Sequence, residues 1–496
     1  MKKHLLQLLL FIMIPLSSIA QVDITLGTPY QVVDAFQKKY FYEGDKILSI
    51  KVMRTNIFLQ KFDANSLSLI KVTAYKDLPK NSVVEKIAKF ANRYYIFYSL
   101  WDKKDEVEQL FSREIDFKSG VFINAGKLIL KIEQKLTSSE TSFESGSVTS
   151  YNIDKFNFYT SNDTSKIFIQ SRLKPNTKND SKSYDIININ VFNQNFDPIW
   201  NQEIKMPYTE KKMNNIDYSV DYEGNAYILS MVYDDNTTDI KKNKDATPNY
   251  HLELLRVKAN TNHIDITPIE VADKFINKIG LYEHPMHYMI CAGFYSNGKV
   301  LDNINGVILF KIEKEGKYSD INTYAIDKDQ SAFKNLDLTE VIIEKDGSLL
   351  LIGEQYYVTE HHSSSANGRT IIDYISHYDD MLLTKIDNVG KLSWMKRLSK
   401  RQMGGGQENK GYKYIREENN YNILFFDNSG LLNKYTINNI KGDVIKTSIL
   451  NPNNIKGIQL FQYGEYKILT IAPSTFVFES YKKNKEDILI KVNLSK

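Results

Sequence analysis

The sequence has few of the residues that point to a disulfide framework, a thiolate metal site or a nucleic-acid partner. It contains one cysteine, Cys291, among 496 residues. A single cysteine can form neither an intrachain disulfide nor a thiolate-rich metal site. The 64 Lys and Arg residues nearly balance the 60 Asp and Glu residues, which leaves a net charge of +4. Nucleic-acid-binding proteins usually carry a strongly basic face, so we expect no nucleic acid as a partner.

Motifs typical of catalysis or cofactor binding are also missing. The sequence has no Gly-x-Ser-x-Gly nucleophile elbow. Residues 403–406, Met-Gly-Gly-Gly, lack the Lys-Ser/Thr pair that completes a phosphate-binding loop. Calcium loops with alternating Asp residues are absent as well. We therefore predict no cofactor and no metal, and we assign no catalytic residue.

Long apolar runs are confined to the N-terminus. Lys2 and Lys3 precede an apolar stretch at residues 5–16, and Ser18 and Ala20 are the small residues that a signal peptidase reads. This pattern is typical of a secretory signal peptide, and the apolar run is shorter than the ~20 residues that a membrane-spanning helix needs. We predict that residues 1–20 are a signal peptide and that the exported protein is soluble, in the periplasm, at the cell surface or secreted. Without a cysteine after the signal, it is not expected to be a lipoprotein.

The rest of the chain consists of short segments rich in Ile, Leu, Val, Tyr and Phe, separated by clusters of Asn, Asp, Gly and Lys. This composition is typical of an all-β protein. Residues 218–229, 341–352 and 414–425 resemble one another, and each is predicted to be a strand, a polar turn and a second strand. Gly224 and Gly347 stand where a tight turn needs a positive φ.

A second predicted hairpin, at residues 192–200 and 386–394, completes a repeat unit of four strands. Trp200 and Trp394 follow its turn and are expected to pack between neighbouring sheets. Eight apolar segments, spaced by about sixty residues, are interpreted as the second strand of each copy. They are Ile47-Leu48, Tyr95-Ile96-Phe97, Ile167-Phe168-Ile169, Tyr227-Ile228-Leu229, Met289-Ile290, Leu349-Leu350-Leu351, Ile423-Leu424-Phe425 and Ile468-Leu469.

A four-stranded repeat that recurs without linkers predicts a single β-propeller of seven or eight four-stranded blades over residues 21–496, with eight favoured. Residues 119–150 fit the repeat poorly and are interpreted as an insertion or a displaced strand. The pattern at residues 221–228, and Asp387 to Gly390 followed by Trp394, resemble the degenerate repeats of secreted bacterial β-propellers of the Bacteroidetes type. This resemblance implies a fold and leaves the function open.

Long polar connections indicate which face of the propeller binds a partner. The connection between strands two and three is long in four successive copies, at residues 174–183, 234–249, 296–305 and 360–373. These connections should emerge side by side on one face, while short turns such as 388–390 lie on the other. Loops carry function more often than the scaffold does, so the loop-rich face is the predicted binding surface. The alternative is that these loops are tolerated insertions without a ligand.

The predicted loop at residues 360–373 holds the best candidate binding residues. Two adjacent imidazoles with nearby carboxylates could coordinate a divalent cation or present a polar patch to a sugar. A flexible polar loop also contains such a mixture by chance. The candidate binding residues are His361, His362, Tyr356, Tyr357, Arg369 and Tyr374, with Asp373, His377, Asp379 and Asp380 nearby.

A second histidine pair has the residue types of a transition-metal site. His284 and His287 are followed by Cys291, but Pro285 interrupts the segment, and the residues after it read as a strand. The simpler interpretation is that Cys291 is a small buried residue of a blade core.

The function predicted from these patterns is that of an exported, monomeric, non-enzymatic β-propeller. Its loop-rich face would bind an envelope protein, a peptide or a glycan. The alternative is a polysaccharide hydrolase or lyase with its site at the central funnel. An enzyme of this kind requires titratable groups that converge on the funnel, which a scaffold does not.

Overall fold

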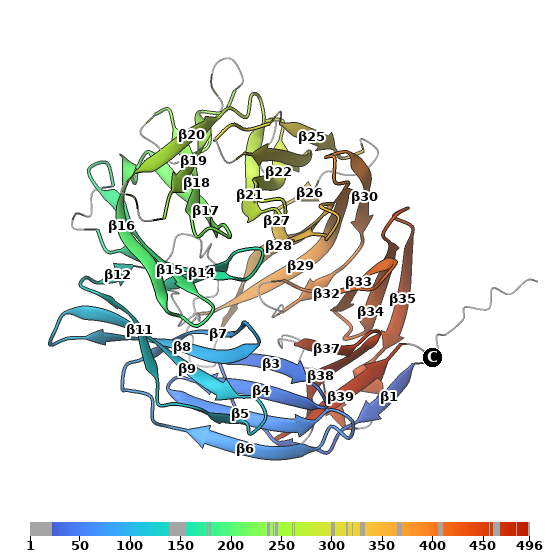
Figure 1. Cartoon of the computed structure of the whole chain (residues 1–496). Coiled ribbons are helices and arrows are strands. Elements are labelled where there is room, and N and C mark those ends of the chain that lie inside the picture. The colour runs from blue at the N-terminus through green and yellow to red at the C-terminus, as the bar shows by residue number, and fades with distance from the viewer. Residues whose placement is uncertain are drawn as a thin grey trace, which may run out of the picture.

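The computed structural model shows eight antiparallel sheets, each built on four strands and arranged in a ring (Figure 1). The fold is a β-propeller of eight blades, which confirms the predicted fold class and the favoured number of blades. The structure describes residues 22–494, except 138–154, 176, 178–179, 236–238, 242, 244–246, 260, 262, 299–302, 314–315, 320, 328–332, 365–369, 405–409, 456, 460–466 and 483. The predicted signal peptide therefore lies outside the described residues.

Each blade runs from an inner strand at the axis to an outer strand at the rim. The inner strands of blades 1 to 8 are β3 (Gln37–Glu43), β7 (Val83–Phe90), β13 (Phe156–Thr160), β17 (Met213–Val220), β21 (Phe275–Glu283), β27 (Leu336–Ile343), β32 (Lys413–Arg416) and β37 (Ile468–Ala472). The second strands are β4 (Lys46–Met53), β8 (Arg93–Asp102), β14 (Lys166–Leu173), β18 (Ala226–Tyr233), β22 (Met289–Ser296), β28 (Leu349–Ser364), β33 (Asn420–Phe426) and β38 (Thr475–Lys482).

The third strands are β5 (Asn56–Asp63), β9 (Val107–Asp116), β15 (Tyr184–Asn193), β19 (Tyr250–Val257), β24 (Gly306–Ile312), β29 (Thr370–Ile386), β34 (Leu432–Asn438) and β39 (Glu486–Asn493). The outer strands are β6 (Leu69–Tyr75), β11 (Lys127–Ile132), β16 (Pro198–Thr209), β20 (Ile264–Ile269), β25 (Asn322–Ala325), β30 (Leu392–Leu398), β35 (Val444–Leu450) and β1 (Asp23–Leu26). Short additional elements are β2 (Tyr30–Gln31), β10 (Val121–Phe122), β12 (Leu136–Thr137), β23 (Asn303–Ile304), β26 (Phe333–Lys334), β31 (Gln402–Met403), β36 (Ile458–Gln459) and the 3-10 turn η1 (Pro452–Asn454).

Seven of the eight apolar segments assigned to second strands lie in second strands. The eighth assignment is wrong, because Ile468 and Leu469 belong to the inner strand β37, and β38 is the second strand of blade 8. Both strands of that hairpin are apolar, so hydrophobicity alone could not separate them. In the segment 119–150, β11 pairs with β9 and takes the outer position of blade 2, while residues 138–150 lie outside the described residues.

Packing between blades forms the core, because alternate residues of a strand face opposite neighbours. In β18, Leu229 packs with Cys291 of blade 5, whereas Ile228 packs with Ile189 of blade 3. Every residue of β18 is therefore buried. Full burial of a large apolar side chain contributes roughly 1.5–3 kcal/mol, so these interfaces hold the ring together.

The two tryptophans join neighbouring blades, as predicted from their place in the repeat. The indole N–H of Trp200 in blade 3 donates to the carbonyl of Gly224 in blade 4 at 2.8 Å. In the same way, Trp394 in blade 6 donates to the carbonyl of Asn439 in blade 7 at 3.1 Å. Gly224 has a φ of 89°, a backbone conformation in which a residue without a Cβ avoids strain.

The first and last strands of the chain close the ring. β1 pairs with β39 along its whole length, so the N-terminal strand completes the last blade. At this closure interface the fully buried Lys51 Nζ lies 2.6 Å from Glu479 Oε1 and 3.2 Å from Asp487 Oδ2. The hydroxyls of Tyr30 and Tyr40 donate to the same glutamate at 2.6 and 2.7 Å. These contacts tie blade 8 to blade 1.

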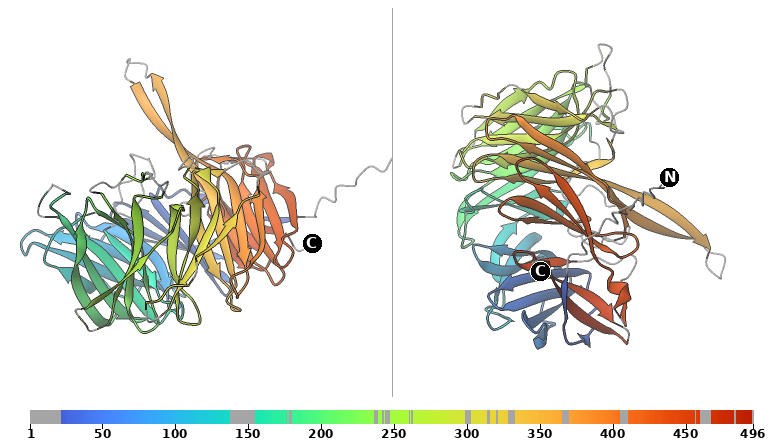
Figure 2. Two further views of the ribbon diagram at one scale, coloured as in Figure 1. Left: turned by 90° about the horizontal axis from the view of Figure 1, so that it is seen from above. Right: turned by 90° about the vertical axis from the view of Figure 1, so that its right-hand side faces the viewer.

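Successive strands of a blade run in opposite directions, which decides where each connection emerges. The connections between strands two and three, and those that lead to the next inner strand, leave the same face of the ring. All four long connections predicted from the sequence join second and third strands. We call this the loop-rich face, and the β28–β29 hairpin projects from it far beyond the ring (Figure 2). Among the described residues, no helix has the length and apolar character that crossing a membrane requires.

Candidate functional site

The most prominent feature of the loop-rich face is the projecting β28–β29 hairpin. The interpretation of residues 360–373 as a loop is wrong, since β28 continues to Ser364 and β29 begins at Thr370. The pairing runs without a break from Tyr356 opposite Tyr378 to Ser364 opposite Thr370. Tyr, Val, Thr and Ile are frequent here, and these residues favour an extended backbone.

The outer half of this hairpin has no neighbouring strand in the part of the chain that the structure describes. β27 pairs with β28 only as far as Gln355, and β30 pairs with β29 only from Met381 onward. The short strand β31 adds two pairs, at His377 and Tyr378. Beyond these residues both edges of the ribbon present backbone N–H and C=O groups that no described strand pairs.

Opposite faces of the ribbon carry the two candidate histidines. Consecutive residues of a strand point to opposite sides, so His361 and His362 cannot bind one cation together. His362 Nε2 lies 3.4 Å from Glu360 Oε2, and both side chains are exposed. Arg369 lies outside the described residues. No group of three or more His, Cys, Asp and Glu side chains suited to a metal ion occurs among the described residues.

Ring contacts hold the base of the hairpin. Tyr357 stacks on His377 with ring centroids 4.5 Å apart, and its hydroxyl donates to Asp379 Oδ2 at 3.0 Å. On the other face, the ring of Tyr356 lies 5.1 Å from that of the buried Tyr378. Toward the tip, Ile372 and Tyr374 are 45% and 37% exposed. The candidate tyrosines thus divide into two that stiffen the base and one that faces solvent.

A buried ion pair anchors the hairpin to the ring. Lys400 Nζ lies 2.7 Å from Glu354 Oε1, and it donates to the carbonyl of Tyr378 at 2.8 Å. The second oxygen of Glu354 accepts the backbone N–H of Gly411 at 2.7 Å. Because both charged groups are satisfied, this pair fixes the direction in which the hairpin leaves the ring.

The other histidine pair, His284 and His287, lies in the turn between β21 and β22, away from the loop-rich face. His284 is buried, stacks on Tyr288 with centroids 4.3 Å apart, and has Nε2 3.2 Å from the carbonyl of Gly347. Burial lowers the pKa of His284. Cys291 lies in a blade core, where burial raises the pKa of its thiol, so the structure supports the interpretation as a core residue.

Lysines recur at the loop-rich end of several inner strands. Inner strands begin at this face, and four adjacent blades, 7, 8, 1 and 2, each place a lysine at or near the start of the inner strand. We call these residues the lysine arc: Lys413, Lys467, Lys39 and Lys86. Blade 7 adds Lys410, which forms an ion pair with Glu340 of blade 6.

Burial and the charges of neighbouring lysines both affect the pKa values of these side chains. Burial lowers the pKa of Lys39 to about 8, and the charges of the other three members of the arc add to this effect. Lys410 also has its pKa lowered to about 8, by burial and then by Lys413 and Lys39. Burial lowers the pKa of Lys413 as well. Among the described residues, no carboxylate lies within ion-pair distance of Lys413.

Three carboxylates on the inner strands of blades 4 and 6 have partners in the structure. Asp337 Oδ1 lies 3.0 Å from Lys278 Nζ, and Glu340 is paired with Lys410. Asp217 accepts the backbone N–H groups of Leu281 and Tyr218, and burial raises its pKa to about 6.

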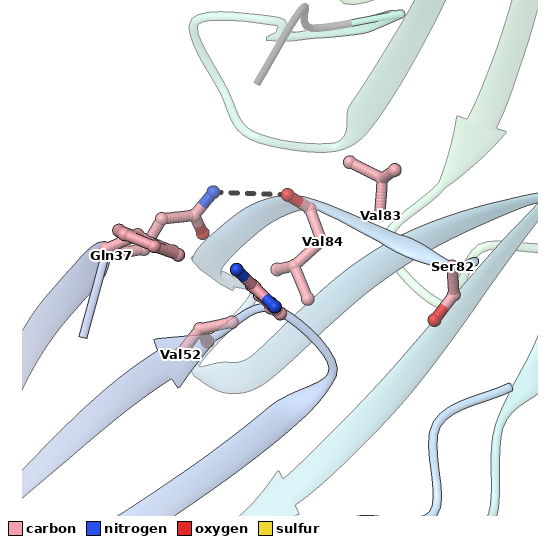
Figure 3. A pocket seen from close by; sticks show the side chains of 7 residues that line it. Gln37, Val52, Ser82, Val83 and Val84 are labelled. Atoms are coloured by element: carbon pink, nitrogen blue, oxygen red, sulfur yellow. Dashed lines mark hydrogen bonds between the residues drawn. The ribbon is translucent and has the colours of Figure 1, made fainter. Parts of the chain in front are cut away.

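A cavity of ≈ 280 Å³ opens beside the lysine arc, between blades 1 and 2 (Figure 3). Gln37 bridges the two blades, since its side-chain amide donates to the carbonyl of Val84 at 3.1 Å. Lys39 lies two residues after Gln37, and Lys86 lies two residues after Val84. The cavity is lined by Phe36, Gln37, Val52, Arg54, Ser82, Val83 and Val84.

Neither the lysine arc nor the cavity was predicted from the sequence. Histidines stand out because the chain has only 8 of them, whereas Lys and Arg together number 64. The available signal was the recurrence of Lys in the first residues of the inner strands. That signal can be used only when the start of each repeat is known, and the repeats resemble one another too weakly for the sequence to show it.

No protein-family model matches the sequence, and no curated protein matches it. Solved structures with similarity include the Dos1 propeller, at 9% identity and a TM-score of 0.42, with 95% of each chain covered. A structure from a study of two prolyl endopeptidases has 9% identity and a TM-score of 0.41, with 93% of this chain and 55% of that chain covered. A post-proline cleaving enzyme from Rickettsia typhi has 11% identity and a TM-score of 0.40, with coverage of 92% and 58%.

The chain thus spans little more than half the length of these peptidase chains. The identities and TM-scores are too low to transfer an activity.

Proposed function

We propose that this protein is an exported, non-enzymatic binding protein whose loop-rich face engages a protein partner of the cell envelope. The observation that carries the proposal is the projecting part of the β28–β29 hairpin, residues 358–364 and 370–376. A two-stranded ribbon that stands away from its sheet has only marginal stability in water, so a ribbon of this length indicates a role outside the ring.

The hairpin has the features of a surface that binds an extended segment of another protein. Beyond Ser376, whose carbonyl accepts the N–H of Gly404, its edges carry backbone groups that no described strand pairs, and these can add a strand from a partner by main-chain hydrogen bonds. Ile372 and Tyr374 lie on one face of β29 and are partly exposed, which offers apolar contacts beside that edge. The Lys400–Glu354 pair at the base holds the ribbon in a fixed direction, which lowers the entropic cost of binding.

Capture of envelope proteins by the mature protein tests the proposal. In the test variant, residues 358–376 are replaced by Asn-Gly, a two-residue turn that joins Tyr357 directly to its strand partner His377. The control variant is Val389→Ser, in an exposed turn on the opposite face. We expect proteins captured by the unmodified protein and by the control to be lost with the shortened hairpin. Equal capture by all three proteins would contradict the proposal.

Export and the monomeric state belong to the same proposal. N-terminal sequencing of the protein from the envelope fraction should begin at Gln21, and light scattering should give the mass of one chain. Intact residues 1–20 in the purified protein would remove export from the proposal.

The alternative, a polysaccharide hydrolase or lyase, receives less support from the axial end of the ring. Glycoside hydrolysis commonly uses two carboxyl groups that flank the scissile bond. The described carboxylates near this end are engaged, Asp337 by Lys278 and Glu340 by Lys410.

A further inference from the structure

The closure interface holds a lysine against two carboxyl groups. Lys51 comes from β4 of blade 1, whereas Glu479 and Asp487 come from β38 and β39 of blade 8. Lys51 Nζ lies 2.6 Å from Glu479 Oε1 and 3.2 Å from Asp487 Oδ2. The side chain of Lys51 is 0% exposed, and those of Glu479 and Asp487 are 8% and 6% exposed. Water therefore has little access to the place where the three groups meet.

The strand register and two tyrosines hold these groups in position. Glu479 pairs with Leu489, which lies two residues after Asp487, so both carboxyl groups point to the same side of blade 8. The hydroxyl of Tyr30 donates to Glu479 Oε1 at 2.6 Å, and that of Tyr40 donates to Oε2 at 2.7 Å. Groups held together in this way react as if each were present at very high concentration.

The two carboxyl groups differ in how readily they take a proton. Burial raises the pKa of Asp487, and the charge of Glu479 adds to this effect. Burial also raises the pKa of Glu479, but the charges of Lys51 and Lys38 outweigh burial and lower it to about 2. Two carboxyl groups whose pKa values are pushed apart can take different roles in a reaction. Asp487 is then the carboxyl group that an amine attacks, and Glu479 is a base beside that amine.

The buried pair at the base of the hairpin lacks this arrangement. Lys400 is also buried against a carboxylate, that of Glu354. The second oxygen of Glu354 accepts the backbone N–H of Gly411. No second carboxylate of the described residues lies within ion-pair distance of Lys400. A base beside the amine is therefore a feature of the closure interface and not of every buried lysine in this protein.

We propose that Lys51 and Asp487 form an isopeptide bond that joins blade 1 to blade 8 covalently, with Glu479 as the base. The ion pair is the state before the bond forms. One proton of the Lys51 ammonium group passes through Glu479 to Asp487, which leaves a neutral amine beside a protonated carboxyl group.

The bond then forms by condensation and needs no further reactant. Lys51 Nζ forms a bond to Cγ of Asp487. Glu479 takes a second proton from the nitrogen and gives it to the hydroxyl group on Cγ, the Cγ–O bond breaks, and water leaves. Of the three ammonium protons, one remains on the amide nitrogen and two leave in the water. Glu479 ends as a carboxylate, so the net charge of the three groups does not change.

Burial favours the amide over the ion pair. A buried ion pair has lost the hydration of two charges, whereas the amide carries no charge. Exclusion of water also protects the bond from hydrolysis. Lys51 and Asp487 lie near opposite ends of the chain, and a cross-link that closes a long loop restricts the unfolded chain more than one that closes a short loop. A protein with a single cysteine would thus gain a covalent closure without a disulfide.

Mass spectrometry of a tryptic digest of the full-length protein tests the proposal. Trypsin does not cleave after an acylated lysine, so residues 47–54 should stay intact and be joined to residues 486–491. The joined peptide should have the summed mass of its two parts less one water. Cleavage after Lys46, which is ion-paired to Asp63 nearer the surface, shows in the same digest that an ion pair alone does not block trypsin. If residues 47–51 and 486–491 appear only as separate peptides, the proposal is overturned.

Three variants assign the roles. Lys51→Arg keeps the positive charge but cannot form the amide, and Asp487→Ala removes the carboxyl group, so neither should give a joined peptide. Glu479→Gln keeps both reacting groups and removes the base, so the fraction of joined peptide at equal times after synthesis should fall at least about tenfold. A joined peptide in Asp487→Ala would overturn the proposal, and an undiminished one in Glu479→Gln would overturn the role of Glu479. Melting temperatures show whether each variant is folded, and the digest of the unmodified protein decides the proposal without them.

Discussion

Two regions of the ring bury lysines in opposite ways. At the closure interface, Lys51 is fully buried against two carboxylates, and two tyrosine hydroxyls donate hydrogen bonds to Glu479. At the lysine arc, Lys39 is partly buried and its strongest charged neighbours are other lysines. The first arrangement pairs the buried lysine with carboxylates, whereas in the second the charges of neighbouring lysines act against Lys39. The comparison teaches that the closure interface stabilises the fold, whereas burial and lysine repulsion disfavour the charged form of Lys39.

The pKa values support this distinction. Burial raises the pKa of Glu479, but Lys51 and Lys38 outweigh that effect and hold its pKa well below the usual range. Lys39 instead has its pKa lowered to about 8, because its charged form is disfavoured in the folded protein. The same substitution of lysine by methionine should therefore have opposite effects on stability at the two places.

The largest expected effect is that of Lys51→Met. This substitution leaves Glu479 and Asp487 buried without their shared cation, and breaking a buried pair in this way costs about 3–5 kcal/mol. Urea denaturation at neutral pH measures the change in the free energy of unfolding. The control Lys46→Met removes an ion pair with Asp63 near the surface and should cost about 0–1 kcal/mol. A similar small cost for both variants would contradict the role assigned to the closure interface.

Tyr30→Phe should have a smaller effect in the same direction. It removes one hydrogen bond to the buried Glu479 carboxylate, and hydrogen bonds to charged groups contribute about 1.5–3 kcal/mol. Tyr318→Phe, at an exposed position, serves as the control and should change stability by less than about 0.5 kcal/mol. The two effects are compared by the shift in the urea midpoint. No difference between them would mean that Glu479 does not depend on Tyr30.

The smallest expected effect, and the one of opposite sign, is that of Lys39→Met. Below pH 8 Lys39 is charged in both the folded and the unfolded protein, so the folded state carries the full cost of the buried charge. Removal of this charge should stabilise the protein by roughly 1–2 kcal/mol at pH 7. Urea denaturation measures the gain, and a loss of stability larger than 1 kcal/mol would show that Lys39 supports the fold.

The pH dependence of the same variant sharpens the comparison. As the pH rises above about 8, folded Lys39 releases its proton before the unfolded chain does, because the unfolded pKa is near 10.5. The unfolded state then binds more protons, so the stability of the unmodified protein rises with pH in this window. The advantage of Lys39→Met should shrink accordingly between about pH 8 and pH 9.5. An advantage that stays constant with pH would contradict the lowered pKa.

Much of the fold could be predicted from local patterns. Period-two hydrophobicity and turn glycines, such as Gly224, gave the strand–turn–strand units and their number. The one misassigned strand, β37, belongs to a hairpin whose two strands are equally apolar. The residues at 360–373 were expected to form a loop because polar residues and a glycine are frequent there. Residues 360–364 and 370–373 instead extend a hairpin, because the β-branched and aromatic residues on both arms pair across it.

The candidate site could be predicted only in part. Sequence placed the long connections on one face, and the structure has all four between second and third strands. It could not tell that His361 and His362 point to opposite sides, since that depends on the strand register that the hairpin adopts. Of the six candidate binding residues, Tyr356 and Tyr357 lie at the base of the hairpin, and His361, His362 and Tyr374 lie toward its tip. Arg369 lies outside the described part of the chain.

The sequence by itself determined the repeating unit, because strand period, turn residues and the spacing of apolar segments are local properties of a chain. Only the tertiary structure decided what the repeats bring together. Lys39 and Lys467 lie near opposite ends of the sequence, and they become neighbours because β1 pairs with β39 and closes the ring. Closure places the start of every inner strand around one axis, so that the charges of lysines from separate repeats act on one another.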